Sequence, residues 1–439
     1  MNFINTMLFK LRVLFYYFRT KYFRRFRNRA SLLHFQERQV RRHLKWVVKK
    51  SPFYKAWFGD LPLHRYRELP FLEKSIMMEN FSDLNTRGID RDEAIALALS
   101  AETSRDFKST LNGVTVGLSS GTSGNRGIFL VSDQERALHA GTILAKLLPG
   151  SIFSRYKVAF FMRANSNLYT ASQSSRIEFQ FFDLLMPLQD HFGRLKTWVP
   201  DLVFAPPSLL IRLAEAQKSG VISIWPKRIF SIAETLDPLD EMKIQETFHQ
   251  KIHQVYQCTE GFLGISCNEG TIHLNEDCTQ IEPFWLDADH IKFMPVITDF
   301  SRTSQPLIRY RLNDILTRKL DPCPCGSALM AIESIEGRAD DIIFFPEGIS
   351  VFPDFIRRAI IQAHPKIEEY LVRQLKHGEL VISVRCENIY RSEIETRIRE
   401  EIEILAQTVK STPPHLQFAR TFPELQGKKL RRVIQEDKR

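Results

Sequence analysis

The chain has 439 residues, of which 44% are hydrophobic and 26% are charged, and this composition is typical of a globular protein. A chain of this length exceeds what one hydrophobic core usually serves, so two or three domains are expected. The formal net charge of +10 favours an anionic partner, but no zinc-finger, ribonucleoprotein or basic-zipper pattern accompanies it, so we expect no nucleic acid partner. No run of eighteen apolar residues occurs, which predicts no transmembrane helix.

Positive charge is concentrated in residues 1–30. This segment contains no acid, and its apolar residues recur at helical spacing between Lys10, Arg12, Arg19, Lys21, Arg24, Arg25, Arg27 and Arg29. Two interpretations stay open: a basic amphipathic helix on an anionic membrane, or a helix packed on the main body, which is favoured. Lys10 and Arg12 interrupt the apolar run that a secretory signal requires. We therefore expect a cytoplasmic protein, with peripheral contact at the inner membrane face as the open alternative.

The next segment, residues 31–110, is expected to be mainly helical. Residues 34–54, HFQERQVRRHLKWVVKKSPFY, keep a helical period until Ser51-Pro52 interrupts it. No residue of this segment suggests chemistry by itself.

The strongest local motif is LSSGTSGNRG, residues 118–127, between strands predicted from Val114 to Val116 and over residues 128–132. Glycines let successive N–H groups converge, hydroxyls add donors, and Arg126 adds a planar charged fork. The loop therefore predicts a polyphosphate site, and a flexible linker is the alternative. A Walker P-loop is excluded because no Gly-Lys-Ser/Thr ends it. The expected binding residues are Ser119, Ser120, Gly121, Thr122, Ser123, Gly124 and Arg126.

From Ser132 onward, predicted strands alternate with predicted helices. Ser132 and Glu135 form a capping-box pattern for a helix that runs to about Leu148. Strands are expected at residues 157–162, 201–205 and 228–235, and helices follow the last two. This order is typical of a doubly wound α/β domain, in which ligands bind beyond the carboxyl ends of the strands.

Two later segments carry side chains suited to a nucleotide. In YQCTEG, residues 256–261, the ring of Tyr256 can stack on a base, the hydroxyl of Thr259 can meet a phosphate, and the carboxylate of Glu260 can hold magnesium. The alternative is a core tyrosine before an exposed turn. In PLIRYRLNDI, residues 306–315, one carboxylate, that of Asp314, can accept hydrogen bonds from both ribose hydroxyls.

Taken in order, these segments resemble the motifs of the adenylate-forming superfamily of acyl- and aryl-CoA ligases. The closest resemblance is to the branch of phenylacetate-CoA ligases and of the synthetases that adenylate a deazaflavin coenzyme. YQCTEG departs from the family pattern Tyr-Gly-x-Thr-Glu by having Gln257 in place of glycine. GRADDII, residues 337–343, resembles the Gly-Arg-x-Asp-Asp motif at the family's domain junction.

The resemblance implies the α/β fold class, with a large N-terminal α/β domain of doubly wound sheets and a small C-terminal α/β lid domain. Residues 1–110 would be the helical part of the large domain, residues 111–337 its nucleotide-binding core, and residues 338–439 the mobile lid. The lid is expected to contain a helix over residues 353–363, a hairpin that turns at His377-Gly378, and a helix over residues 392–405.

The resemblance also assigns roles to individual residues. Lys428, in LQGKKLRRVI, would reach the carboxylate and the α-phosphate from the lid, and Thr259 and Glu260 would complete the catalytic set, with Glu260 holding magnesium. Asp340 would be the hinge residue. The nucleotide would further contact Ala233, Glu234, Tyr256, Asp314 and Arg338.

The implied activity has two steps. ATP activates a carboxylic acid, expected to be aryl or similarly flat, to an acyl adenylate with release of pyrophosphate, and a thiol such as CoA or an acyl carrier protein then displaces AMP. ATP and magnesium are the implied cofactors, with CoA as a co-substrate. Two alternatives stay open: adenylation without thioester formation, as in the deazaflavin-coenzyme synthetases, and a membrane-surface nucleotide-binding protein without turnover.

The cysteines suggest a separate site. Cys323 and Cys325 flank a single proline, and Cys267 with His273 can complete a tetrahedral zinc site. Some ligases of the phenylacetate branch resemble this pattern. Such a zinc would be structural, because all four ligands are protein. Free buried thiols are the alternative, and Cys278 is a competing ligand.

Overall fold

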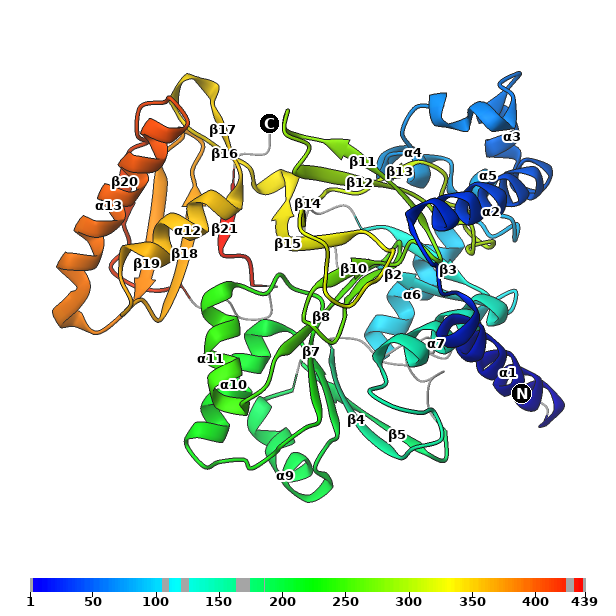
Figure 1. Ribbon diagram of the computed structural model, residues 1–439, viewed down its shortest axis with the longest axis horizontal. Coiled ribbons are helices and arrows are strands. Elements are labelled where there is room, and N and C mark those ends of the chain that lie inside the picture. Colours follow the sequence, from blue (N-terminus) through cyan, green and yellow to red (C-terminus); the bar gives the residue numbers. More distant parts are fainter. Residues whose placement is uncertain are drawn as a thin grey trace.

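The computed structural model describes residues 3–104, 110–119, 126–162, 174–184, 186–423 and 430–436, and residues 3 and 4 by their backbone alone. Figure 1 shows a large α/β body and, at its left side, a smaller unit of sheet and helices formed by the C-terminal residues. None of the helices in these described ranges combines the length and the apolar character needed to cross a bilayer.

The N-terminal part is helical, as predicted. The Asn28 side chain accepts a hydrogen bond from the Ser31 amide and thereby caps the helix that follows. The Ser51 side chain accepts from the Tyr54 amide, so a new helix begins where the sequence predicted an interruption. The elements are α1 (Phe3–Phe18), η1 (Arg19–Phe23), α2 (Arg29–Lys50), α3 (Pro52–Phe58), η2 (Leu63–Glu68), α4 (Lys74–Glu79), α5 (Phe81–Leu84) and α6 (Arg91–Ser104).

A small antiparallel sheet carries the two ends of the predicted polyphosphate loop. Its strands are β1 (Thr110–Leu111), β2 (Val114–Leu118) and β3 (Ile128–Val131), in that spatial order. Helix α7 (Asp133–Leu147) follows, and Ser132 and Glu135 form the predicted capping box. The two strands predicted on either side of residues 119–127, and the helix predicted after them, are therefore confirmed.

Parallel strands in the order β5-β4-β6-β7-β8 form the centre of the body. Along β4, Val158 and Phe160 pack with α1 and α7, whereas Ala159 and Phe161 pack with α9 and α10. Helices thus cover both faces, and the doubly wound prediction is confirmed. The elements are β4 (Tyr156–Met162), β5 (Ile177–Asp183), α9 (Leu188–Trp198), β6 (Leu202–Ala205), α10 (Pro207–Lys218), β7 (Arg228–Ser231), α11 (Pro238–Phe248) and β8 (Ile252–Cys258).

One strand prediction was too long. Residues 228–235 were expected to be extended, but β7 ends at Ser231. Ala233 has a φ of +66°, in the left-handed region, so the backbone leaves the sheet before the predicted end.

The same sheet continues with antiparallel strands, which the sequence did not predict. Strand β9 folds back on β8 in a hairpin, and the 12-stranded sheet of the described residues then runs on to β11 at its far edge. The added strands are β9 (Gly261–Ser266), β10 (Ile272–Leu274), β11 (Gln280–Trp285), β12 (Lys292–Thr298), β13 (Tyr310–Arg311), β14 (Asp314–Arg318) and β15 (Ala331–Arg338).

The C-terminal residues form a unit with its own core, in which Leu239 is the one buried residue contributed from before residue 339 among those described. Its four-stranded sheet has the order β20-β19-β18-β21. The elements are η3 (Ala339–Asp341), β16 (Ile343–Phe344), η4 (Pro346–Gly348), β17 (Ser350–Val351), α12 (Pro353–Ala363), β18 (Glu369–Gln374), β19 (Leu380–Arg385), η5 (Asn388–Tyr390), α13 (Arg391–Thr408), β20 (Leu416–Phe418) and β21 (Val433–Gln435). The two predicted helices and the hairpin are confirmed.

A buried ion pair joins this unit to α11 of the body. One nitrogen of Arg432, Nη2, donates to both carboxylate oxygens of Asp240, at 2.8 and 2.7 Å. Tyr370 donates its hydroxyl hydrogen bond to Asp237, at the start of α11. Both contacts are charge-assisted and buried, and they join the C-terminal unit to α11 in the orientation that the structure has.

Candidate functional site

A cavity of about 1250 Å³ lies between the body and the C-terminal unit. It is lined by a residue at or just after the carboxyl end of each of the five parallel strands, where doubly wound folds bind their ligands. These residues are Met162, Leu184, Pro206, Ala233 and Cys258. Leu430 and Arg431 line the cavity from the C-terminal unit. The position of the cavity therefore follows from the topology of the sheet.

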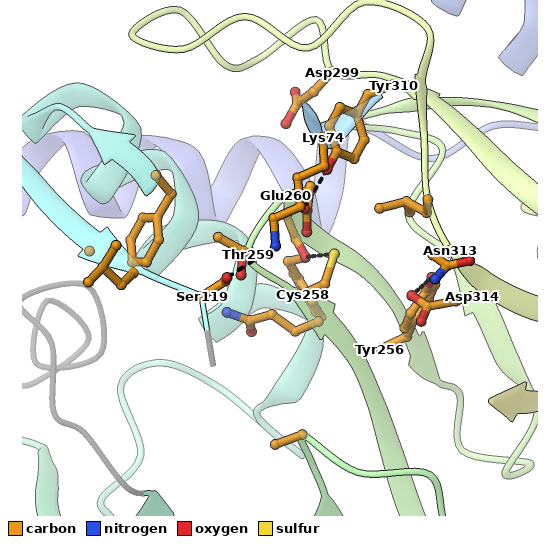
Figure 2. A pocket seen from close by; sticks show the side chains of 18 of the residues that line it. Lys74, Ser119, Tyr256, Cys258, Thr259, Glu260, Asp299, Tyr310, Asn313 and Asp314 are labelled. Atoms are coloured by element: carbon orange, nitrogen blue, oxygen red, sulfur yellow. Dashed lines mark hydrogen bonds between the residues drawn. The ribbon is translucent and has the colours of Figure 1, made fainter. Parts of the chain in front are cut away.

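At one side of the cavity, Tyr256 and Asp314 are joined. The Tyr256 hydroxyl donates a hydrogen bond of 2.8 Å to Oδ2 of Asp314, and Figure 2 shows the two side chains side by side. Burial, and then the adjacent Asp314 carboxylate, raise the pKa of Tyr256 well above its ordinary value. Tyr256 therefore stays protonated and holds the carboxylate at the cavity wall.

Glu260 is fixed by two contacts from a different part of the sheet. The Tyr310 hydroxyl donates to Oε1 of Glu260 at 3.0 Å. The guanidinium of Arg302 donates to the backbone carbonyl of Glu260 at 2.9 Å and to that of Thr259 at 3.3 Å. The turn that carries Thr259 and Glu260 is therefore held with its carboxylate at the cavity (Figure 2).

Lys74, the first residue of α4, is a site residue that the sequence analysis missed. Its Nζ lies 3.5 Å from Oγ of Ser119, and Figure 2 places it between Ser119 and Glu260. Burial lowers the pKa of Lys74, and the Glu260 carboxylate partly opposes this shift. No local motif marks this lysine, because it reaches the cavity through a long-range bridge between Leu72 and Tyr310.

Two hydrogen bonds join the two ends of the predicted polyphosphate loop. Ser119 donates its amide hydrogen to the Gly127 carbonyl at 2.8 Å, and the Gly127 amide donates to Oγ of Ser119 at 2.7 Å. A side chain at position 127 would collide with Lys74, since a Cβ there would lie 2.9 Å from its Cε atom. The candidates Ser120, Gly121, Thr122, Ser123 and Gly124 lie outside the described residues.

Arg126 also lines the cavity, and its guanidinium has two partners. Nη1 donates to Glu102 of α6 at 2.8 Å, and Nε donates to the Ser119 carbonyl at 3.0 Å. These contacts join α6 to the start of the predicted polyphosphate loop, and the contact of Arg126 with a polyphosphate stays a prediction.

Ala233 and Glu234 also line the cavity, next to the amino end of α10. The Glu234 carboxylate accepts a hydrogen bond of 3.3 Å from the Ser208 amide. The left-handed backbone of Ala233 turns the chain along the cavity wall instead of extending β7. Non-glycine residues in this conformation are frequent at binding sites, since the surrounding structure must hold them there.

At the junction with the C-terminal unit, Arg338 ends β15 and Asp340 lies in η3, and both line the cavity. The next residue, Asp341, accepts a hydrogen bond of 2.9 Å from Nε of Arg431. Lys428 lies outside the described residues. Leu430 and Arg431, the first described residues after it, line the cavity beside this junction.

A second cluster lies away from the cavity, where β10 and the segment between β14 and β15 meet. Ligand atoms of Cys267, His273, Cys323 and Cys325 all lie within 4.8 Å of one another. Nδ1 of His273 lies 3.1 Å from the Leu329 carbonyl, and its Nε2 lies 3.2 Å from Sγ of Cys325. The Leu329 contact favours a proton on Nδ1, which leaves the lone pair of Nε2 toward the sulfurs. Cys278 is not part of this cluster.

Comparisons with known proteins agree with this architecture, although no protein-family model matches the chain. A phenylacetate-coenzyme A ligase of Pseudomonas putida is 25% identical over 260 residues, which cover 53% of this chain and 57% of that protein. Protein CapK of Staphylococcus aureus is 23% identical over 257 residues, which cover 56% of this chain and 55% of that protein. The chain thus matches little more than half the length of these relatives.

Among solved structures, the fold is similar to that of a 2-hydroxyisobutyryl-CoA ligase in the postadenylation state. The TM-score is 0.69 at 17% identity, over 93% of this chain and 89% of that chain. The amide bond synthetase McbA of Marinactinospora thermotolerans gives a TM-score of 0.54 at 13% identity, over 72% and 68% of the two chains. The fold is that of the adenylate-forming CoA ligases, as the sequence motifs indicated.

Proposed function

We propose that this chain activates a carboxylic acid with ATP and transfers the acyl group to a thiol such as CoA. In the first step a carboxylate oxygen attacks the α-phosphorus and pyrophosphate leaves. In the second step the thiol sulfur attacks the acyl carbon and AMP leaves with the bonding electron pair. The observation that carries the proposal is the convergence of Lys74, Ser119, Glu260 and Asp314 on one cavity in this fold.

The nucleotide would lie along the wall from Asp314 to Ser119. The carboxylate of Asp314, which accepts a hydrogen bond from Tyr256, would also accept hydrogen bonds from the ribose hydroxyls. The ring of Tyr256 would stack on the base. Ala233, Glu234 and Arg338 would complete this wall, and the loop from Ser119 to Gly124 would bind phosphates. The hydroxyl of Thr259 would contact a phosphate as well.

Magnesium is the implied metal of this reaction, and Glu260 is the residue suited to hold it. Its carboxylate is an oxygen ligand of the kind that magnesium prefers, and Tyr310 orients it at the cavity. When bound, the ion would neutralise charge on the phosphates. Lys74 adds a positive charge on the same side without being a metal ligand.

Residues 338–439 are proposed to act as a lid that turns at Asp340 and brings Lys428 to the cavity. The TM-score of the whole chain is 0.69 against the postadenylation structure of 2-hydroxyisobutyryl-CoA ligase and 0.53 against its thioesterification structure. A difference of this kind supports a C-terminal unit that takes more than one orientation during the reaction.

The acid would bind among apolar side chains of the cavity, to which Phe129, Met162, Leu184 and Phe262 contribute. The two aromatic rings among them favour a flat acid, in line with the aryl acid expected from the sequence. An acyl carrier protein in place of CoA, or no thiol step at all, are the alternatives for the second half-reaction.

The four-ligand cluster is proposed to hold a structural zinc. Three thiolates and one imidazole at mutual distances of this size suit tetrahedral zinc, and the contact of His273 with Leu329 orients the imidazole. The ion would join β10 to the segment between β14 and β15, away from the reacting groups.

The direct test is acid-dependent pyrophosphate exchange across a panel of aryl and alkyl acids, with magnesium present. We expect exchange with at least one aryl acid, and thioester formation when CoA or carrier protein is added. Exchange without any thioester would select the adenylation-only alternative. ATP binding without exchange for any acid would contradict the proposal and favour a nucleotide-binding protein without turnover.

Substitution of Lys74 tests whether the cavity is the site of the proposed reaction. Lys74→Gln is expected to lower the rate of pyrophosphate exchange by about 10- to 100-fold, because one charge-assisted contact to phosphate contributes about 1.5–3 kcal/mol. Lys74→Arg should retain most of the rate, since it keeps the charge. Lys55→Gln, at an exposed position on α3, is the matched control. Unchanged exchange in Lys74→Gln at all ATP concentrations would show that Lys74 only supports the loop.

A further inference from the structure

Helix α1 packs on the body through one face. Val13 and Tyr17 are buried in a cluster with α7 and β4. The approach of the two helices is close, because a Cβ at Gly141 of α7 would lie 2.6 Å from the Val13 carbonyl oxygen. The helix is therefore attached to the body, as the favoured interpretation of the sequence expected.

The same helix leaves a second apolar face exposed. Met7, Leu11 and Phe15 recur every four residues and form one stripe, and between 49% and 60% of each is exposed. Phe23, the last residue of η1, is 80% exposed as well. Phe153 lies beside α1, with its ring centroid 6.3 Å from that of Phe18, and is also exposed. Monomeric proteins seldom leave such a contiguous apolar stripe in water, so the stripe indicates an interaction surface.

Cations border this stripe. On a helix of 3.6 residues per turn, Lys10 and Arg12 fall on its opposite edges, and both are exposed. Arg25 and Arg27, also exposed, follow at the end of η1. Residues 1–30 contain no acid. The surface therefore combines apolar side chains in its middle with positive charge along its sides.

We propose that this surface, formed by α1, η1 and Phe153, binds an anionic lipid bilayer. The apolar stripe would enter the boundary between headgroups and acyl chains, and the flanking cations would contact lipid phosphates. A second copy of the chain is a poorer occupant, because two such surfaces would bring cations together without any acid in residues 1–30 to pair them. No residue of this surface lines the cavity, so the inference stands independently of the proposed activity.

The bilayer would lie one helix away from the cavity. Helix α7 turns Gly141 toward α1, while Leu138 and Thr142 of the same helix line the cavity. Attachment through α1 therefore fixes the body with α7 near the lipid surface. The cavity itself stays on the side of α7 that faces away from α1.

The test is sedimentation of the full chain with phosphatidylcholine vesicles, with and without phosphatidylglycerol. We expect binding to the anionic vesicles alone, and weaker binding at high salt. Leu11→Glu with Phe15→Glu should lower vesicle binding at least tenfold without lowering Tm, because both positions are exposed. Ile389→Glu, at a position that is 76% exposed in the C-terminal unit, is the matched control and should bind as the unchanged chain does.

A second variant tests the charge alone: Lys10→Glu with Arg12→Glu should lose binding to anionic vesicles as well. Equal binding to neutral and anionic vesicles would overturn the inference, as would undiminished binding of the Leu11→Glu, Phe15→Glu variant. Dimers that disappear in that variant, without vesicle binding of the unchanged chain, would identify a second copy as the occupant. Pyrophosphate exchange should be equal in all these variants, which separates this result from any failure of the proposed activity.

Discussion

Replacement of Glu260 with glutamine is expected to lower acid-dependent pyrophosphate release by about 100-fold, the usual loss when one preorganised electrostatic contact to a transition state is removed. Glutamine has almost the same shape and keeps an oxygen that can accept the Tyr310 hydrogen bond. What it lacks is the negative charge that residue 260 would need as the proposed magnesium ligand. The loss should therefore come from metal binding and not from a displaced turn.

A magnesium titration separates these two causes. Glu260→Gln should need a higher magnesium concentration for half-maximal rate, and its Tm should match that of the unchanged chain. Glu400→Gln, at an exposed position of α13, is the control for the loss of one carboxylate. A full rate for Glu260→Gln at ordinary magnesium concentrations would remove Glu260 from the proposed site. A lower Tm with an unchanged magnesium dependence would assign it a structural role.

The parts of the fold that follow from local pattern were predictable. The capping box of Ser132 and Glu135, the strands on either side of the polyphosphate loop, and the helix at Pro353–Ala363 all depend on residues close together in the chain. Spacing and capping rules act over this range. The order of the motifs then predicted the fold class, and the comparison with solved structures confirms that fold class.

Residues that enter the site through distant contacts were not predictable. Lys74 reaches Ser119 because Leu72 pairs with Tyr310, more than 200 positions later in the chain. The contact of Arg126 with Glu102 was not predictable for the same reason, since Glu102 belongs to no recognisable motif. Tyr256 and Asp314 were each named, but the hydrogen bond between them depends on the pairing of antiparallel strands that the sequence did not reveal.

The second large effect is expected at the cysteine cluster. The purified chain should contain about one zinc per molecule, since four ligands complete one tetrahedral site. The ligands come from three places: Cys267 after β9, His273 in β10, and Cys323 with Cys325 between β14 and β15. Removal of the metal, or the variant Cys323→Ser, should therefore release the segment between β14 and β15, and the folded state would lose the free energy of metal binding.

We expect that loss to be about 3 kcal/mol in the free energy of unfolding, the stabilisation by a ligand present at roughly 100 times its Kd, seen as a Tm lower by about 5 °C. Cys278→Ser should keep the zinc content, because Cys278 lies outside the cluster, and Cys386→Ser is the control for a cysteine in the C-terminal unit. The rate of pyrophosphate exchange should fall much less than the stability does, because no ligand of the cluster lines the cavity. A metal-free protein with the same Tm before and after chelation would instead identify the four side chains as buried thiols and an imidazole that pack without an ion.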